Sequence, residues 1–119
     1  MQGLHLTADL HGCAAKQAVM TDPDTLRALC LGAVAASGLQ AVGEVFHAFP
    51  APGGVTGVVL LAESHLAVHT WPERSAVTLD VYVCNLHADN SARAQALLSA
   101  LEQPFAAAHC ERHRVQRGA

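Results

Sequence analysis

Apolar and polar residues alternate in several segments of the chain, which is the pattern of a half-buried β-strand. The alternation is clearest over residues 77–84, where it places Cys84 on the polar side of the strand, and it recurs over residues 4–11. Apolar and β-branched runs at 42–49 and 55–62 flank a short Pro/Gly cluster. They predict two neighbouring strands joined by a turn.

Two other segments have the apolar spacing of helices, with leucines and alanines on one face. The signals that begin and end them are Thr21 or Asp22, Pro23 and Gly38 for the first, and Asp89 or Asn90 and Pro104 for the second. Residues 106–115 form a weaker pattern that we interpret as a last strand.

The order of these elements predicts an α+β fold. We expect a two-layer α/β sandwich in which an antiparallel sheet carries helices on one face and leaves the other face free for a partner. The two halves of the chain have similar element order, so the sequence suggests an internally duplicated β-α-β-β-α-β arrangement.

Composition indicates one folded domain over residues 1–119, because 51% of the chain is hydrophobic and only 14% is charged. So few charges on a small domain favour a homo-oligomer that hides apolar surface. A net charge of −3 with scattered basic residues argues against nucleic acid as a partner. No membrane span or signal peptide is visible, so we expect no membrane partner and a cytoplasmic location with reduced cysteines.

Polar side chains interrupt apolar sequence over residues 61–73, and three kinds of site compete for them. His65 and His69 could ligate a metal, but on a strand they would lie about 13 Å apart, so we expect no metal. Ser64 could be a hydrolase nucleophile, but the Gly-x-Ser-x-Gly elbow is absent. Alternatively, the Glu63–Ser64 peptide bond could cleave itself. The serine hydroxyl would attack the preceding carbonyl, and β-elimination from the resulting ester would leave a new amino-terminal carbonyl group.

Two runs of sequence extend this last interpretation: Glu-Ser-His-Leu-Ala-Val-His-Thr-Trp-Pro-Glu at 63–73 and Asp-Val-Tyr-Val-Cys at 80–84. Together they resemble the short bacterial form of S-adenosylmethionine decarboxylase. Earlier runs that are also similar to this family are Gly3–Leu6, Asp9–Cys13, Phe46–Phe49 and Gly54–Val59. The resemblance covers most of residues 3–84.

The resemblance implies a pyruvoyl-dependent proenzyme. Self-cleavage between Glu63 and Ser64 would give a beta chain, 1–63, and an alpha chain, 64–119, and would convert Ser64 into a pyruvoyl group. That group would replace pyridoxal phosphate: it would form a Schiff base with S-adenosylmethionine and accept the electrons released as carbon dioxide leaves. The product would supply aminopropyl groups for the synthesis of spermidine.

The resemblance also implies roles for other residues. Cys84 would protonate the product carbon, and His69 would assist self-processing. Thr56 would assist it too, at a position where the family commonly has serine. Two aromatic rings would stack on adenine, and one carboxylate would accept hydrogen bonds from the ribose hydroxyls. These substrate-binding residues are Phe49, Trp71 and Glu73.

Other interpretations stay open. A pyruvoyl-dependent arginine or ornithine decarboxylase would use the same machinery, and residues 74–76 depart from the family's usual sequence. A non-catalytic homologue would be expected to lose Ser64, His69 or Cys84, yet all three are present. Taken singly, the cysteine and the aromatic residues would also suit a hydrophobic core. Strand alternation places Ser64 and His69 on opposite faces of one strand.

Overall fold

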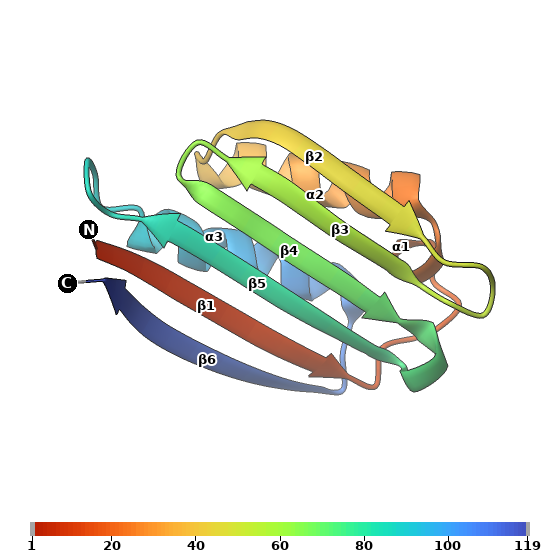
Figure 1. Ribbon diagram of the computed structural model, residues 1–119. Coiled ribbons are helices and arrows are strands. Elements are labelled where there is room, and N and C mark those ends of the chain that lie inside the picture. Colours follow the sequence, from red (N-terminus) through yellow and green to blue (C-terminus); the bar gives the residue numbers. More distant parts are fainter. Residues whose placement is uncertain (1, 119) are drawn as a thin grey trace.

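Six antiparallel strands form one sheet in the order β2-β3-β4-β5-β1-β6 in a computed structural model that describes residues 2–118 (Figure 1). The helices lie on one face of this sheet, and the other face is open. The predicted α+β two-layer architecture is therefore confirmed; positions 1 and 119 of the predicted domain lie outside the described residues. In chain order the elements are β1 (Gln2–His11), α1 (Ala18–Thr21), α2 (Pro23–Ser37), β2 (Ala41–Ala48), β3 (Val55–Leu61), β4 (Ser64–Trp71), the 3-10 turn η1 (Pro72–Arg74), β5 (Ala76–Cys84), α3 (Ser91–Glu102), the 3-10 turn η2 (Gln103–Phe105) and β6 (His109–Gly118).

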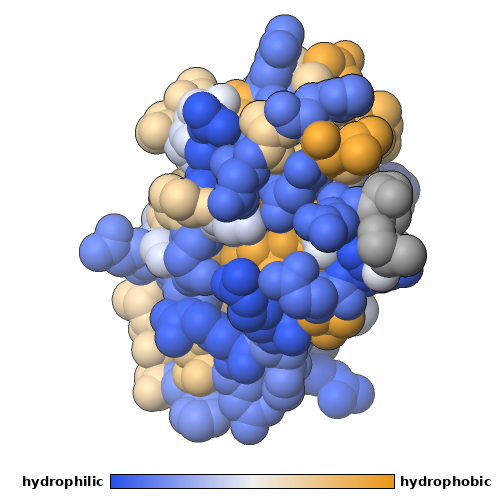
Figure 2. All heavy atoms as spheres, turned by 90° about the vertical axis from the view of Figure 1, so that its left-hand side faces the viewer, coloured by the Kyte–Doolittle hydropathy of each residue, from blue (hydrophilic) through white to orange (hydrophobic). Residues whose placement is uncertain are grey.

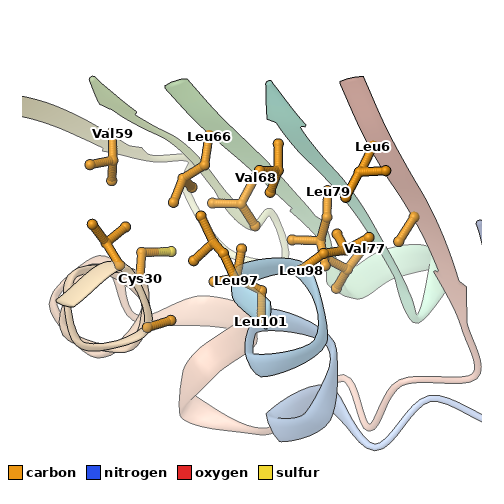
Figure 3. Close-up of a cluster of buried hydrophobic side chains, with 14 of the residues drawn as sticks. Leu6, Cys30, Val59, Leu66, Val68, Val77, Leu79, Leu97, Leu98 and Leu101 are labelled. Carbon is orange, nitrogen blue, oxygen red and sulfur yellow. The ribbon is translucent and has the colours of Figure 1, made fainter. Parts of the chain in front are cut away.

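The core lies between the sheet and the helices. In β5 every second residue is buried, as the alternation predicts, and Cys84 lies on the half-buried open face. Figure 3 shows the strand residues of the core pointing toward α2 and α3. Those that it labels are Leu6, Val59, Leu66, Val68, Val77 and Leu79 from the sheet, and Cys30, Leu97, Leu98 and Leu101 from the helices.

The helix boundaries follow from local chemistry. Asp22 caps α2, because its carboxylate accepts a 3.1 Å hydrogen bond from the backbone N–H of Thr25. Gly38 ends the helix with a φ of 85°, a left-handed conformation that glycine adopts without steric cost. At α3 the carboxylate of Asp89 accepts from the N–H of Ser91 at 3.0 Å.

The last strand starts later than the sequence predicts, at residue 109 instead of 106. The η2 turn buries Phe105, and Ala106 then takes a left-handed φ of 47°, so the chain becomes extended only beyond it. β6 lies at the edge of the sheet and is largely exposed on both sides, which removes the alternation that would have marked its start.

Two features of the topology bear on function. β1 is first in the sequence but lies between β5 and β6, the last two strands (Figure 1). Apart from the 3-10 turns, the first half runs strand, short helix, helix, strand, strand, and the second runs strand, strand, helix, strand. The two orders differ, and the suggested internal duplication stays a prediction. Within the described part of the chain, no helix is both long and apolar enough to cross a membrane.

Candidate active site

The predicted cleavage site lies in a tight hairpin between β3 and β4. Leu61 pairs with Ser64, which leaves only Ala62 and Glu63 in the turn. Two-residue hairpins favour turns with positive φ at their central residues. Among residues 2–118, the non-glycine residues with positive φ are Ser64, Ser75 and Ala106, so in this hairpin the positive φ falls on the residue after the turn and not on its two central residues. The φ of Ser64 is 151°, in a range that side chains rarely adopt. The turn therefore strains the residue whose hydroxyl would attack the chain.

Cys84 holds the carbonyl that would be attacked. Its backbone N–H donates a 2.7 Å hydrogen bond to the carbonyl oxygen of Glu63. This contact extends the β4–β5 ladder by one step, because Ser64 pairs with Val83. An N–H in this position polarises the carbonyl and can stabilise negative charge on its oxygen during attack. The half-buried side chain of Cys84 lies at the same end of the sheet.

A cavity of about 420 Å³ opens beside this hairpin. Figure 2 views the molecule from the side on which the hairpin lies and shows a largely hydrophilic surface. The Glu63 side chain is fixed there, because its Oε1 accepts a 3.2 Å hydrogen bond from the backbone N–H of Gln40. The cavity is lined by Gly38, Ala62, Glu63, Cys84, His87, Ala88, Asn90 and Arg93.

The predicted processing residues form a second group, at the opposite end of β3 and β4. Thr56 and His69 are cross-strand partners, and the Thr56 hydroxyl lies 3.1 Å from Nδ1 of His69, within hydrogen-bond distance. The His69 ring stacks on Trp71, with centroids 6.1 Å apart and an interplanar angle of 24°. A hydroxyl and an aromatic ring thus fix the orientation of this imidazole.

The other predicted substrate-binding residues also lie at this end. Phe49 follows the last residue of β2, is 51% exposed and meets the ring of His47 edge-on at 4.8 Å. Trp71 is 42% exposed, so neither aromatic ring is a core residue. Glu73 lies in η1 and lines an apolar cavity of about 380 Å³ beside Pro72.

A single chain does not bring the two groups together. Ser64 and His69 are five residues apart on β4, about 17 Å at the usual rise of a strand. Ser64 pairs with the buried Val83, whereas His69 pairs with the half-buried Thr56 and Thr78 on the open face. Ser64 and Cys84 therefore lie near one end of the strands, and His69 and its neighbours lie near the other.

One cluster of potential ligands among residues 2–118 is not visible in the sequence pattern. Pairing between β1 and β6 sets Asp9 opposite Glu111, and the ligand atoms of these two residues and His113 lie within 4.8 Å of one another. The signal was the register of β1 against β6, which no local pattern reveals. The expectation that the protein needs no metal stays a prediction.

The chain is similar to known proteins over nearly all of its described residues. A family model described as S-adenosylmethionine decarboxylase matches residues 4–118. The chain belongs to the S-adenosylmethionine decarboxylase family. A crystal structure of the adenosylmethionine decarboxylase from Aquifex aeolicus VF5 superposes with a TM-score of 0.87 at 33% identity, covering 98% of this chain and 91% of that one.

Curated members of the S-adenosylmethionine decarboxylase family are similar in sequence too. The S-adenosylmethionine decarboxylase proenzyme of Aquifex aeolicus is 45% identical over 82 residues, which are 69% of this chain and 58% of the relative. That of Pyrococcus furiosus is 36% identical over 104 residues, 87% of this chain and 73% of the relative. The match thus spans less than two thirds of the Aquifex protein, and 59% of a 44% identical proenzyme from Persephonella marina, where it again covers 69% of this chain.

Proposed function

We propose that this protein is a self-processing, pyruvoyl-dependent carboxy-lyase that decarboxylates S-adenosylmethionine. Its product would be the aminopropyl donor for spermidine synthesis. The observation that carries the proposal is the Glu63–Ser64 junction: a strained serine follows a carbonyl that already accepts a hydrogen bond from the N–H of Cys84, in a chain of this family.

Self-processing uses groups of the chain alone. The Ser64 hydroxyl adds to the Glu63 carbonyl carbon while the N–H of Cys84 stabilises the oxygen. Release of the strained backbone at Ser64 favours the resulting ester over the peptide bond. β-Elimination of the ester would then leave residues 1–63 and 64–119 as the two chains.

The hairpin also suits the group that the family name implies. A pyruvoyl group made from Ser64 supplies an electron sink for the loss of carbon dioxide from an α-amino acid. The Cys84 thiol lies at the same end of the sheet as Ser64 but on the open face, whereas Ser64 pairs with the buried Val83. Cleavage would free residue 64 as a chain end, and the proposal requires that its carbonyl group then turn toward this thiol, which would protonate the product carbon. Phe49 and Trp71 offer exposed rings to adenine, and Glu73 offers a carboxylate to the ribose.

We also propose that the active protein is a homo-oligomer whose open sheet faces meet. Val45 and Leu60 on this face are 72% and 52% exposed, which is costly for a sheet left in water. A two-fold axis running across the strands, between two facing sheets, reverses the strand direction. It would bring His69 of the partner subunit to the Ser64 end of the open face, which His69 of the same chain cannot reach.

A cytoplasmic location agrees with this chemistry, because proton donation by Cys84 requires a free thiol. All four cysteines of the chain are free. Reducing compartments keep thiols in this state.

The proposal is tested by intact-mass measurement and by release of carbon dioxide from S-adenosylmethionine, arginine and ornithine. We expect cleavage between residues 63 and 64 and turnover of S-adenosylmethionine alone, with Ser64→Ala uncut and inactive. A wild-type chain that stays whole on incubation would refute self-processing. Turnover of arginine or ornithine without S-adenosylmethionine would instead overturn the substrate.

A further inference from the structure

We propose that Arg93 binds the carboxylate that Glu63 acquires at its main chain during self-cleavage, and thereby stabilises the leaving group of the elimination step. This inference rests on the proposed self-processing. It assigns to the cavity beside the hairpin a role that is separate from binding the substrate.

A short hydrogen-bond network places Arg93 near the scissile bond. Its Nη1 donates to Oδ1 of Asn90 at 3.0 Å, and Nδ2 of Asn90 donates to the carbonyl of Cys84 at 2.9 Å. The N–H of Cys84 in turn holds the carbonyl of Glu63 at 2.7 Å. Asn90 is 6% exposed, so the network has a fixed centre. Arg93 and Glu63 both line the cavity of about 420 Å³.

Arg93 has no acidic partner among residues 2–118 of the uncut chain. The ion pairs of residues 2–118 join other residues, and Nε of Arg93 lies over Gly38, 3.3 Å from where a Cβ would stand. The Glu63 side chain is the only carboxylate in the cavity lining, and the backbone N–H of Gln40 already binds it. A guanidinium can bind a carboxylate through two parallel hydrogen bonds, so Arg93 can bind a new carboxylate that forms in this cavity.

Self-cleavage produces such an anion. In the first step Oγ of Ser64 bonds to the carbonyl carbon of Glu63, and the C–N bond breaks as the nitrogen takes a proton. In the second, a base removes the Cα proton of Ser64, that electron pair forms a Cα=Cβ bond, and the Cβ–Oγ bond breaks. The Oγ electron pair leaves on the new carboxylate of Glu63. The enamine left at residue 64 tautomerises to an imine, and water hydrolyses it to the ketone and ammonia.

The negative charge is complete only after the Cβ–Oγ bond has broken, so a cation near Glu63 assists elimination more than ester formation. The substrate's carboxylate is a poorer match for Arg93. It must lose its charge as carbon dioxide leaves, and an ion pair with a guanidinium would oppose that loss. The carboxylate of Glu63, in contrast, stays in the protein.

The test compares Arg93→Met and Arg93→Lys with Arg74→Met, which removes an exposed arginine from η1 at the other end of the sheet. Each freshly made chain is treated with hydroxylamine, which cuts an ester but not a peptide bond, and its products are weighed. We expect R93M to accumulate an ester that yields residues 1–63 as a hydroxamate and a second chain that begins with serine. Its elimination should slow about tenfold or more, R93K should regain part of the rate, and R74M should behave as wild type.

Arg93 is exposed, but R93M loses the hydrogen bond to Asn90, so the melting temperature of R93M is measured beside that of wild type. If R93M melts lower, R93K tests the inference instead, because it must still accumulate more ester than wild type. Glu63→Gln separates the two carboxylates of Glu63, one on its side chain and one formed at its main chain. If E63Q accumulates the same ester as R93M, Arg93 acts through the Glu63 side chain and the inference is wrong. Wild-type rates in R93M, or arrest before the ester, would also overturn it. An uncut wild type would instead refute self-processing itself.

Discussion

The backbone N–H of Cys84 donates a 2.7 Å hydrogen bond to the carbonyl oxygen of Glu63, while the Cys84 side chain lies on the half-buried open face. Self-processing and decarboxylation should therefore use different atoms of this residue. We expect Cys84→Ser and Cys84→Ala to be cut, because both keep the N–H. Their turnover number should fall about 100-fold or more, because the proton donor is lost or weakened. Gel analysis of cleavage and a carbon dioxide assay on the same samples separate the two effects, and uncut C84A protein would contradict this division.

The distance between Ser64 and His69 predicts complementation between two inactive chains. Ser64→Ala cannot be cut, and His69→Ala should be cut poorly. In a mixed oligomer, however, the S64A chain can offer its own His69 to the Ser64 of the H69A chain. We expect tagged H69A chains to be cut only when S64A chains are co-expressed, as judged by mass spectrometry. Equal cleavage of H69A with and without S64A would show that each chain acts alone.

Thr56 should act through its hydroxyl, which lies 3.1 Å from Nδ1 of His69. Thr56→Val keeps the shape of the side chain but removes the hydrogen bond, so processing should slow about fivefold to tenfold, the equivalent of about 1–1.5 kcal/mol. Thr56→Ser keeps the hydroxyl and gains rotamer freedom, so it should be cut at least as fast as wild type. Time courses of cleavage at one temperature give both rates, and a slow T56S with a normal T56V would reverse the assignment.

Trp71 is the only tryptophan of the chain and is 42% exposed, so it reports on its own surroundings. We expect S-adenosylmethionine to change its fluorescence. Trp71→Ala should raise KM about tenfold, because stacking on a base contributes about 1–3 kcal/mol. The melting temperature should change little. Leu86→Ala is a matched control, since Leu86 is 60% exposed and follows β5, away from the Trp71 end of the sheet.

Cys30 predicts a dependence of stability on alkaline pH. Burial against the sheet raises the pKa of its thiol from 9.0 to about 12, so the folded state keeps the proton that the unfolded state loses. The stabilisation is complete below pH 9 and is lost as the pH rises toward 12, by at most about 1.4 kcal/mol per pH unit. Urea unfolding of wild type and Cys30→Ala at several pH values should show the two free energies converging as the pH rises. Parallel curves would mean that Cys30 does not titrate in this way.

Local patterns predicted the features that depend on one segment. The alternation over 77–84 placed Cys84 on the half-buried face, and counting along the strand placed Ser64 and His69 on opposite faces, because the two-residue period of a strand needs no tertiary information. The cap of α2 at Asp22 could also be predicted from local sequence, because a helix cap joins residues only three apart.

Features that depend on distant segments could not be predicted. Arg93 and Glu63 line one cavity because of how the start of α3 packs at the end of β5, and no motif marks this packing. The proximity of Asp9 and Glu111 depends on the register of two strands that are about 100 residues apart in sequence. Likewise, the start of β6 depends on the burial of Phe105, a tertiary contact that ends the preceding turn.

The place of β1 between β5 and β6 has a thermodynamic consequence for the mature protein. If the chain is cut after Glu63, β1 belongs to one product, and both strands that it pairs with belong to the other. Unfolding then yields two separate molecules instead of one, and their translational entropy favours the unfolded state more strongly at greater dilution. The melting temperature of the processed protein should therefore depend more steeply on its concentration than that of the uncut chain, whose unfolding does not separate β1 from its partner strands.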